Sequence, residues 1–599
     1  MQRVNRNLVW AGALVDELAR CGVRHVCISP GSRSAPLALS FAAHPGIRDR
    51  SILDERSAAF FALGLARASR TPVALVCTSG TAAANYLPAV VEAHHSQVPL
   101  LLLTADRPPE DRACGAGQAI DQTKLYGAYV RLFSELPTPA LEANLLRLVR
   151  RTACRAVATA LGAPAGPVHL NLPFREPLAP VDVPEDLHAA RALDLLSRDG
   201  RGEEPMTRVV APERAHASDS TLRRLARQIG DEPRGWLVAG PLDEAPQFAT
   251  ELSRLARAAG WPLLADALSQ LRSGPHGRAC LVEAHDAVLR ASEFVEAQLP
   301  RLVLRFGAMP TSKAYRLLLE RHPEITQIVV DPSGWSDPTS LASELVRAEP
   351  TGLARDLARE IEALRSAPVS EYSEHWVRAG RRTRRILDTE LAEHAALSEP
   401  GVVHTLARVM PGGSTLFVAS SMPIRDVDGV WPVSEKPLRV LSNRGANGID
   451  GTVSCALGSA LGSNPPLVAL VGDLALLHDW SGLLLARERD IAATLVVLDN
   501  DGGGIFEFLP VASTAGREVF EQHFAAGQGV DLVGALRAFG LEVSTAESAD
   551  QLRSALESSF ARPGVQLVVV RTDRRENLEL HTKLSEAVAR ALEPAGSIR

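Results

Sequence analysis

The chain has few of the features that mark secreted, membrane-spanning or nucleic-acid-binding proteins. Its seven cysteines are scattered over 599 residues without a Cys-x-x-Cys pair, which favours a reducing compartment over a disulfide framework or a zinc site. No apolar run approaches the roughly 20 residues that a membrane helix needs. No long run of lysine or arginine occurs and the net charge is −6, which argues against a nucleic-acid partner. These absences predict a cytoplasmic protein without a membrane span.

The remaining composition is that of a globular protein. Apolar residues make up 46% and charged residues 22% of the chain, both ordinary values for a soluble fold. The length predicts about three or four domains. The apolar stretch at residues 8–15 is short and is broken by Asp16 and Glu17. We therefore expect an amphipathic helix there and not a signal peptide.

Short apolar runs alternate with helical segments along the chain, which is the pattern of parallel α/β sheets. The strand candidates are 24–29, 51–53, 73–77, 100–104 and 168–172, then 235–239, 262–265, 302–306 and 327–330, then 415–419, 439–441, 467–471, 494–498 and 565–570. A proline-rich segment at 173–185, prolonged to about 205, reads as a linker. A charged helical stretch at 351–397 leads to the third group. The sequence thus predicts three consecutive parallel-sheet α/β domains, without a sequence repeat.

A carboxylate and an amide stand where two of these runs end. Asp473 follows Leu467–Gly472, and Asn500 follows Asp499, which comes directly after the apolar run at 494–498. The carboxyl ends of parallel strands form the ligand-binding edge of open sheets. A carboxylate, an amide oxygen and the Gly502 carbonyl are hard ligands that suit Mg²⁺ carrying a diphosphate. The same residues are also ordinary turn formers, so this motif alone leaves both interpretations open.

Two more candidates lie at strand–helix junctions in the first third of the chain. Glu55 follows the strand candidate at 51–53 and precedes a helix with a small-residue face. It is either a helix N-terminal charge, worth under ~1 kcal/mol, or a buried acid that exchanges a proton with a ligand nitrogen. Residues 78–82 follow the next strand, and their small side chains would let backbone N–H groups approach a ligand. Simple helix capping is the alternative.

Basic residues recur at the predicted strand ends of the first and third sheets. They are Arg33, Arg107, Arg425 and Arg444. A single arginine is usually a solvated surface group. Four at ligand-facing ends indicate a substrate with several carboxylates, because the guanidinium fork matches a carboxylate bidentately.

Together these motifs resemble those of thiamine-diphosphate enzymes, which have a pyrimidine-binding, a central and a diphosphate-binding domain. Within that superfamily the chain closely resembles, over essentially its whole length, the 2-succinyl-5-enolpyruvyl-6-hydroxy-3-cyclohexene-1-carboxylate synthases of menaquinone biosynthesis. The most specific motifs are Ser29–Ser34, Thr104–Pro109, Cys114–Ile120 and Ser442–Gly451. The resemblance implies a pyrimidine-binding domain at 1–185, a central domain at 205–365 and a diphosphate- and metal-binding domain at 390–599.

The resemblance also implies a role for each matching residue. Glu55 takes the place of the catalytic, activating glutamate, and Asp473, Asn500 and the Gly502 carbonyl those of the ligands of Mg²⁺ or Mn²⁺. The implied cofactor-binding residues are Thr81, Ser421, Gly448, Ile449, Gly472, Asp473, Asn500 and Ile505. The implied substrate-binding residues are Ser32, Arg33, Arg107, Gln118, Lys313, Arg425, Arg444 and Phe506.

Three positions depart from the pattern of related enzymes. Leu474 stands where the wider superfamily has glycine, although this subfamily also has leucine. Gly117 stands where some members have asparagine, and Ala314 where some have arginine. The last two remove possible hydrogen bonds to a substrate.

The implied activity is that of a transferase. It decarboxylates 2-oxoglutarate and adds the resulting succinyl carbanion to isochorismate, with CO2 as the second product. Each substrate brings two carboxylates, which agrees with the arginines on an otherwise acidic chain. The resemblance further implies a homodimer or homotetramer with active sites at the subunit interface. The alternatives are another thiamine-dependent decarboxylase or acetolactate-type synthase, which would need fewer arginines, and a non-catalytic binding protein on the same fold.

Overall fold

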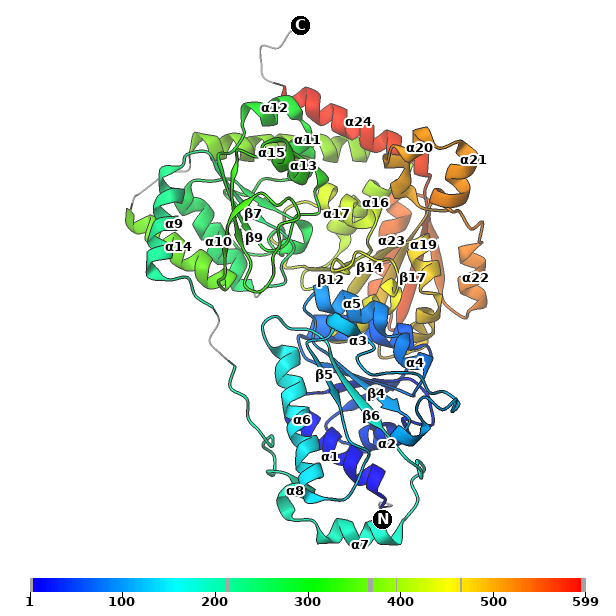
Figure 1. Ribbon diagram of the computed structural model, residues 1–599. Coiled ribbons are helices and arrows are strands. Elements are labelled where there is room, and N and C mark those ends of the chain that lie inside the picture. The colour runs from blue at the N-terminus through cyan, green and yellow to red at the C-terminus, as the bar shows by residue number, and fades with distance from the viewer. Residues whose placement is uncertain are drawn as a thin grey trace. The chain divides into compact units, whose positions relative to one another are not determined.

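The computed structural model describes residues 4–211, 215–244, 246–364, 370–394, 396–463 and 466–593. The chain divides into two compact units (Figure 1). Unit 1 comprises Met1–Pro212, Asn443–Asn464 and Ala475–Ala492, and unit 2 comprises Glu213–Ser442, Pro465–Leu474 and Ala493–Arg599. Each unit is therefore assembled from separate stretches of the chain.

The described part of unit 1 contains a six-stranded parallel sheet in the order β2-β1-β3-β4-β6-β5. Its strands are β1 (His25–Ile28), β2 (Arg48–Ser51), β3 (Val73–Cys77), β4 (Leu100–Asp106), β5 (Leu132–Glu135) and β6 (Val168–Pro173). Strands β3 and β4 are buried at every position, as their continuous apolar runs predict for the centre of a parallel sheet.

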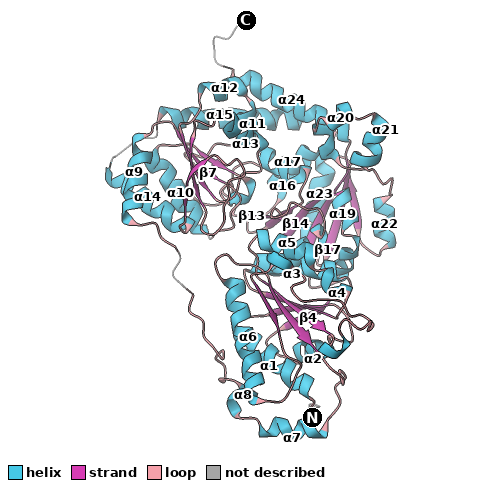
Figure 2. Cartoon of the chain, viewed as in Figure 1, coloured by secondary structure: helices cyan, strands magenta, loops and turns pink. Residues whose placement is uncertain are grey.

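Helices cover both faces of this sheet (Figure 2). On one face, α1 (Arg6–Arg20), α2 (Ala35–Ala42) and α6 (Ala143–Leu161) share a single core with the strands. On the other face pack α3 (Glu55–Ser69) and α5 (Leu87–His95). The amphipathic helix expected near the N-terminus is confirmed by α1.

Helix α3 packs along α18 (Thr452–Gly462) with backbone against backbone. A Cβ on Gly64 would lie 1.9 Å from the carbonyl oxygen of Cys455, and one on Gly458 would lie 2.0 Å from that of Phe61. Only glycine permits this approach. The two helices run parallel. Phe60 lies beside Gly451 toward the start of both helices, and Ala68 lies beside Gly462 at the end of both.

The described part of unit 2 contains two more parallel sheets. The first has the order β11-β10-β9-β7-β8 and the second the order β13-β12-β14-β15-β17-β16. Their strands are β7 (Gly235–Ala239), β8 (Leu263–Ala265), β9 (Leu302–Phe306), β10 (Thr326–Val330), β11 (Ala342–Val346), β12 (Thr415–Val418), β13 (Arg439–Ser442), β14 (Leu467–Gly472), β15 (Ala493–Asp499), β16 (Val543–Ala546) and β17 (Val565–Arg571).

Each sheet of unit 2 is packed against helices of its own (Figure 2). On the first sheet pack α9 (Asp219–Asp231), α10 (Pro246–Ala259) and α14 (Pro350–Leu364). On the second pack α16 (Glu399–Val409), α17 (Met422–Val430), α23 (Ala549–Phe560) and α24 (Arg574–Leu592). The long charged stretch predicted to be helical contains α14 and α15 (Glu371–Glu393).

The sheet of unit 1 and the second sheet of unit 2 have the same topology. Numbered from its own first strand, each described sheet runs 2-1-3-4-6-5, although the sequence shows no repeat. The strand order reverses between the first and third strands, β1 and β3 in one sheet and β12 and β14 in the other. Ligands of open α/β sheets bind at the carboxyl ends of the strands beside such a reversal.

The prediction of an α/β chain with parallel sheets is confirmed, and most strand candidates match. The strand expected at 51–53 is wrong, because β2 ends at Ser51 and its residues are polar and mostly exposed. The linker that we expected to follow residue 173 contains two helices, α7 (Pro184–Ala192) and α8 (Leu195–Asp199). None of the described helices combines the length and apolar character needed to cross a membrane. The bounds predicted for the three domains stay predictions, and their endpoints 1, 365 and 599 lie outside the described residues.

Candidate functional site

The strand ends of the second sheet in unit 2 bring the three expected metal ligands together. Strands β14 and β15 pair side by side, Asp473 follows Gly472, and Asn500 follows Asp499. The Asp473 side chain is only 4% exposed. Its Oδ2 accepts the N–H of Gly502 at 2.8 Å and its Oδ1 accepts that of Leu474 at 2.6 Å.

The charges around Asp473 favour a cation. Burial raises the pKa of Asp473 to about 6, and the neighbouring carboxylates Asp499 and Asp501 add to that rise against the two backbone hydrogen bonds. A carboxylate in this position is costly to ionise without a positive charge nearby. The site therefore has the electrostatics of a cation site.

Asn500 supplies a second indication of a cation site. Its Nδ2 donates to Oε1 of Glu399 at 2.7 Å, which points the amide oxygen the other way. That Oδ1 is buried and has no hydrogen-bond partner among the described residues, an arrangement that costs free energy unless a ligand satisfies it. The Gly502 carbonyl accepts the N–H of Gly504 at 3.0 Å and retains a second lone pair. These oxygens fit Mg²⁺ or Mn²⁺.

Glu399 is a residue of this site that the sequence analysis did not find. It lies in the first turn of α16, is buried, and also accepts the hydroxyl of Thr572 at 3.3 Å. Burial and the nearby Asp426 raise the pKa of Glu399 to about 7. In the sequence Glu399 looks like any acid in the first turn of a helix, because its partners lie far along the chain.

The other candidates of unit 2 lie on helices or turns at strand ends. Ser421 directly precedes α17 and has a φ of 75°, a strained value for a residue with a side chain. Arg425, one turn into α17, is exposed and donates to the Ser421 carbonyl. Lys313 is the exposed first residue of α13 (Lys313–Arg321). Ile505 and Phe506 are half-buried in the 3₁₀ turn η5 (Gly504–Phe508).

In unit 1, Arg33 and Arg107 lie close together after β1 and β4. Arg33 is 6% exposed, and its Nη1 donates to the Phe174 carbonyl at 2.8 Å. Burial and the charge of Arg107 lower the pKa of Arg33, and Glu176 at 3.6 Å balances part of its charge. The Nε atoms of both arginines are buried and have no hydrogen-bond partner among the described residues. Two adjacent guanidinium groups with unused donors have the chemistry to bind a carboxylate.

Glu55 is the first residue of α3 and is half-buried. We expected an acid that binds a ligand nitrogen to be buried, and the described residues of unit 1 bury Glu55 only in part. The preceding Asp54 caps the helix through the N–H of Arg56 at 2.8 Å and accepts the hydroxyl of Ser481 at 2.7 Å. Glu55 therefore lies at a well-anchored helix end, and its carboxylate takes no part in capping that helix.

The loop after β3 forms hydrogen bonds with a second loop. Thr81 is the exposed first residue of the short helix α4 (Thr81–Ala84), and the N–H of Gly80 donates to Oε1 of Gln122 at 3.0 Å. The hydroxyl of Ser79 donates to the Gln118 carbonyl at 2.8 Å, so the exposed Gln118 lies beside this loop. Ser32, before α2, is also exposed.

The loop before α18 is held by a buried glutamate that we did not predict. Glu92 of α5 accepts the N–H groups of Gly445 at 3.0 Å and Ala446 at 2.6 Å. It also pairs with Arg67 at 3.1 Å. This anchor fixes the backbone that carries Arg444, Gly448 and Ile449, all of which are half-buried.

Comparison with known proteins defines the class of protein. Residues 10–125 match the thiamine pyrophosphate enzyme N-terminal TPP binding domain, residues 198–418 the middle domain of thiamine pyrophosphate enzymes, and residues 429–570 the C-terminal TPP binding domain. The fold is thus that of a thiamine pyrophosphate enzyme.

Curated relatives narrow the class to one family. A 2-succinyl-5-enolpyruvyl-6-hydroxy-3-cyclohexene-1-carboxylate synthase from Geobacillus kaustophilus is 46% identical over 587 residues, which cover 98% of each chain. Synthases of the same name from Chloroflexus aurantiacus and Myxococcus xanthus are 45% and 43% identical, over 98% of this chain and 97% and 98% of theirs. The chain belongs to the family of these synthases, as its motifs predicted.

Proposed function

We propose that the chain is the thiamine-diphosphate-dependent carboligase of menaquinone biosynthesis. It decarboxylates 2-oxoglutarate and adds the succinyl unit to isochorismate, which gives 2-succinyl-5-enolpyruvyl-6-hydroxy-3-cyclohexene-1-carboxylate and CO2. The observation that carries this proposal is the similarity, over nearly the full length, to synthases named for that product. The arginines at the strand ends support it, because both proposed substrates are dianions.

The site residues fit the cofactor that the family implies. Asp473, the Asn500 amide oxygen and the Gly502 carbonyl would hold Mg²⁺ or Mn²⁺ and, through it, a diphosphate. When bound, thiamine diphosphate supplies the electron sink for decarboxylation, while the protein binds and orients it. Glu55 would exchange a hydrogen bond or a proton with a ring nitrogen of the cofactor. The remaining proposed cofactor contacts are Thr81, Ser421, Gly448, Ile449, Gly472 and Ile505.

The substrate carboxylates would be bound by charge-assisted hydrogen bonds. Arg33 and Arg107 support this role most directly, because both have buried, unused donors. The other proposed contacts are Ser32, Gln118, Lys313, Arg425, Arg444 and Phe506. We further propose a cytoplasmic homodimer or homotetramer with active sites at the subunit interface and with the three domains at 1–185, 205–365 and 390–599.

A product assay tests the function. Purified protein with Mg²⁺, thiamine diphosphate and isochorismate is supplied with either 2-oxoglutarate or pyruvate, and CO2 release and product mass are followed. We expect CO2 and the succinylated product with 2-oxoglutarate only. Turnover of pyruvate in preference to 2-oxoglutarate would instead identify an acetolactate-type enzyme, and an Asp473→Ala protein serves as the cofactor-deficient control.

A further inference from the structure

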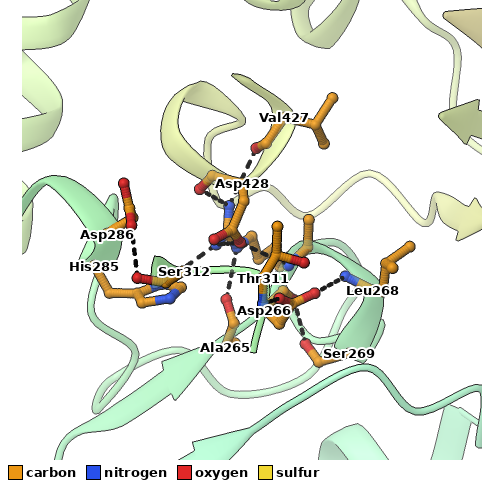
Figure 3. Close-up of polar contacts among 12 residues, drawn as sticks. Ala265, Asp266, Leu268, Ser269, His285, Asp286, Thr311, Ser312, Val427 and Asp428 are labelled. Atoms are coloured by element: carbon orange, nitrogen blue, oxygen red, sulfur yellow. Dashed lines mark hydrogen bonds and ion pairs between the residues drawn. The ribbon is translucent and has the colours of Figure 1, made fainter. Parts of the chain in front are cut away.

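A buried cluster of charged side chains lies in unit 2 beside, but not among, the proposed substrate contacts. Its centre is Arg272 with Asp266 and Asp428, which are 5%, 0% and 2% exposed. Figure 3 shows the two carboxylates on segments that come from different parts of the chain. Asp266 follows β8, whereas Asp428 lies in α17. None of the three side chains can touch a ligand in solution.

Arg272 caps the C-terminal end of α17. Its Nη1 donates to the carbonyls of Asp428 at 2.6 Å and Val427 at 3.3 Å, in the last turn of the helix. Its Nη2 donates to the Asp428 carboxylate at 2.5 Å, and its Nε donates to the Ala265 carbonyl at 2.7 Å. The Val427 carbonyl also accepts the N–H of Trp431 at 3.1 Å, and the C-terminal end of a helix attracts cations. One guanidinium therefore ties the end of α17 to the end of β8.

The carboxylate of Asp428 strengthens the same connection, because it also accepts the N–H of Ala267 at 3.0 Å. A second buried carboxylate holds another side of the helix. Asp426 is completely buried and pairs with Nε2 of His581 in α24 at 2.9 Å. Arg425 is the exposed residue between these anchors. Helix α17 is thus held from two sides, and Arg425 lies on its exposed side.

Asp266 holds the start of a second helix. Its two carboxylate oxygens accept the N–H groups of Leu268 at 2.7 Å and Thr311 at 2.6 Å. Thr311 precedes Ser312, the residue that caps α13 through the N–H of Tyr315 at 3.2 Å. Since α13 begins at Lys313, the loop after β8 sets the position of both Lys313 and the helix that carries Arg425.

We infer that Arg272, Asp428 and Asp266 are positioning residues, which hold Ser421, Arg425 and Lys313 in the register that binds a dianionic substrate. The inference rests on the proposed function for the identity of the substrates. Arg425 and Lys313 have long, exposed side chains, so the positions of their charged groups depend on the positions of the helices that carry them. A buried ion pair is not needed for stability, since apolar residues of similar size often replace one without loss. What apolar residues cannot supply is the fixed set of hydrogen bonds to the end of α17 and, through Asp266, to Thr311.

The test replaces Arg272 with lysine, which keeps the charge but cannot reach the carbonyls and the carboxylate at once. We expect KM for at least one of 2-oxoglutarate and isochorismate to rise about tenfold or more while kcat changes less than about threefold, the pattern for lost uniform binding. Asp428→Asn, which has the same shape, should move KM in the same direction. It also provides the measurement if the lysine variant does not fold.

Arg150→Lys is the matched control. Arg150 is 1% exposed, lies on α6 in unit 1, pairs with Glu17 at 3.1 Å, and donates to the carbonyls of Ser197 at 3.3 Å and Arg198 at 2.7 Å. Its variant should be less stable than the wild type but keep both KM values within about twofold. Hydrogen–deuterium exchange of residues 421–430 and 311–318 should speed up in the Arg272 and Asp428 variants and not in the control.

The possible outcomes distinguish a failure of this inference from a failure of the proposed function. If the folded Arg272 and Asp428 variants keep both KM values within about twofold and exchange at the wild-type rate in both segments, the cluster is only structural and the inference is wrong. If the wild-type protein turns over neither substrate, the proposed function fails, and the exchange measurement still decides whether the cluster holds α17 and the start of α13.

Discussion

Replacing Gly64 with alanine tests the contact between α3 and α18 at its tightest point. The added methyl would lie 1.9 Å from the Cys455 carbonyl oxygen, a backbone atom that cannot rotate away. Alanine gains about 1 kcal/mol over glycine in helix propensity, whereas forcing volume into a packed interface costs about 1–3 kcal/mol. Because two backbones must separate, we expect the cost at the upper end and a net loss of about 2 kcal/mol.

Gly12→Ala is the control with the opposite sign. Gly12 lies within α1, and a Cβ there would meet no atom within 4 Å. The propensity gain then stands alone at up to about 1 kcal/mol. In thermal unfolding followed by circular dichroism, Gly64→Ala should melt about 4–8 °C below and Gly12→Ala about 2–4 °C above the wild type, for a cooperative unit of this size. A Gly64→Ala protein that melts at or above the wild type would refute the close crossing.

Four further expectations concern the site and the core. Glu55→Gln should fold normally but lose roughly 10²–10⁴ in turnover, and proton exchange at C2 of bound thiamine diphosphate, followed by NMR, should slow with it; exchange at the wild-type rate would remove its proposed role. Asp473→Ala should abolish Mg²⁺-dependent binding of thiamine diphosphate in titration calorimetry, and unchanged affinity would place the metal elsewhere. Arg33→Ala and Arg107→Ala should each lower kcat/KM about ten- to a hundredfold and leave cofactor affinity intact, with lysine restoring only part; a loss of cofactor affinity instead would contradict a substrate role. Burial lowers the pKa of His169 to about 3, so the unfolded chain binds its proton first. The stability that this neutral histidine contributes is complete above pH ~6.5 and falls by about 1.4 kcal/mol per pH unit below it, a slope that His169→Gln should remove from melting curves recorded between pH 7.5 and 5.

Sequence analysis located best the residues that can be identified from their immediate neighbours in the chain. A buried parallel strand is a continuous apolar run, and the residue that follows it lies at the ligand-binding edge whatever the rest of the chain does. This is why the places of Asp473 and Asn500 at neighbouring strand ends could be predicted. The strands that were missed, β5, β11 and β16, are edge strands with partly exposed residues, so they lack such a run.

The supporting residues could not be predicted, because their partners are distant in the chain. Glu399 contacts Asn500, and Glu92 contacts Gly445 and Ala446. Each of these acids sits in a helix, where it resembles any solvated charge until the fold buries it. The shared topology of the two six-stranded sheets was also invisible, since strand order is set by tertiary pairing and not by similarity of sequence.

Unit 1 is assembled from separate stretches of the chain, which the ribosome synthesises at different times. Residues up to Pro212 emerge first, but α18 and the segment Ala475–Ala492, which complete the unit, come much later. At about 5–20 residues per second, the nascent chain extends for roughly 15–55 seconds before residue 492 has been added. During that interval the side of α3 that carries Gly64 has no α18 to cover it. A chain truncated before α18 leaves the side of α3 that packs on α18 exposed, and we therefore expect such fragments to fold incompletely.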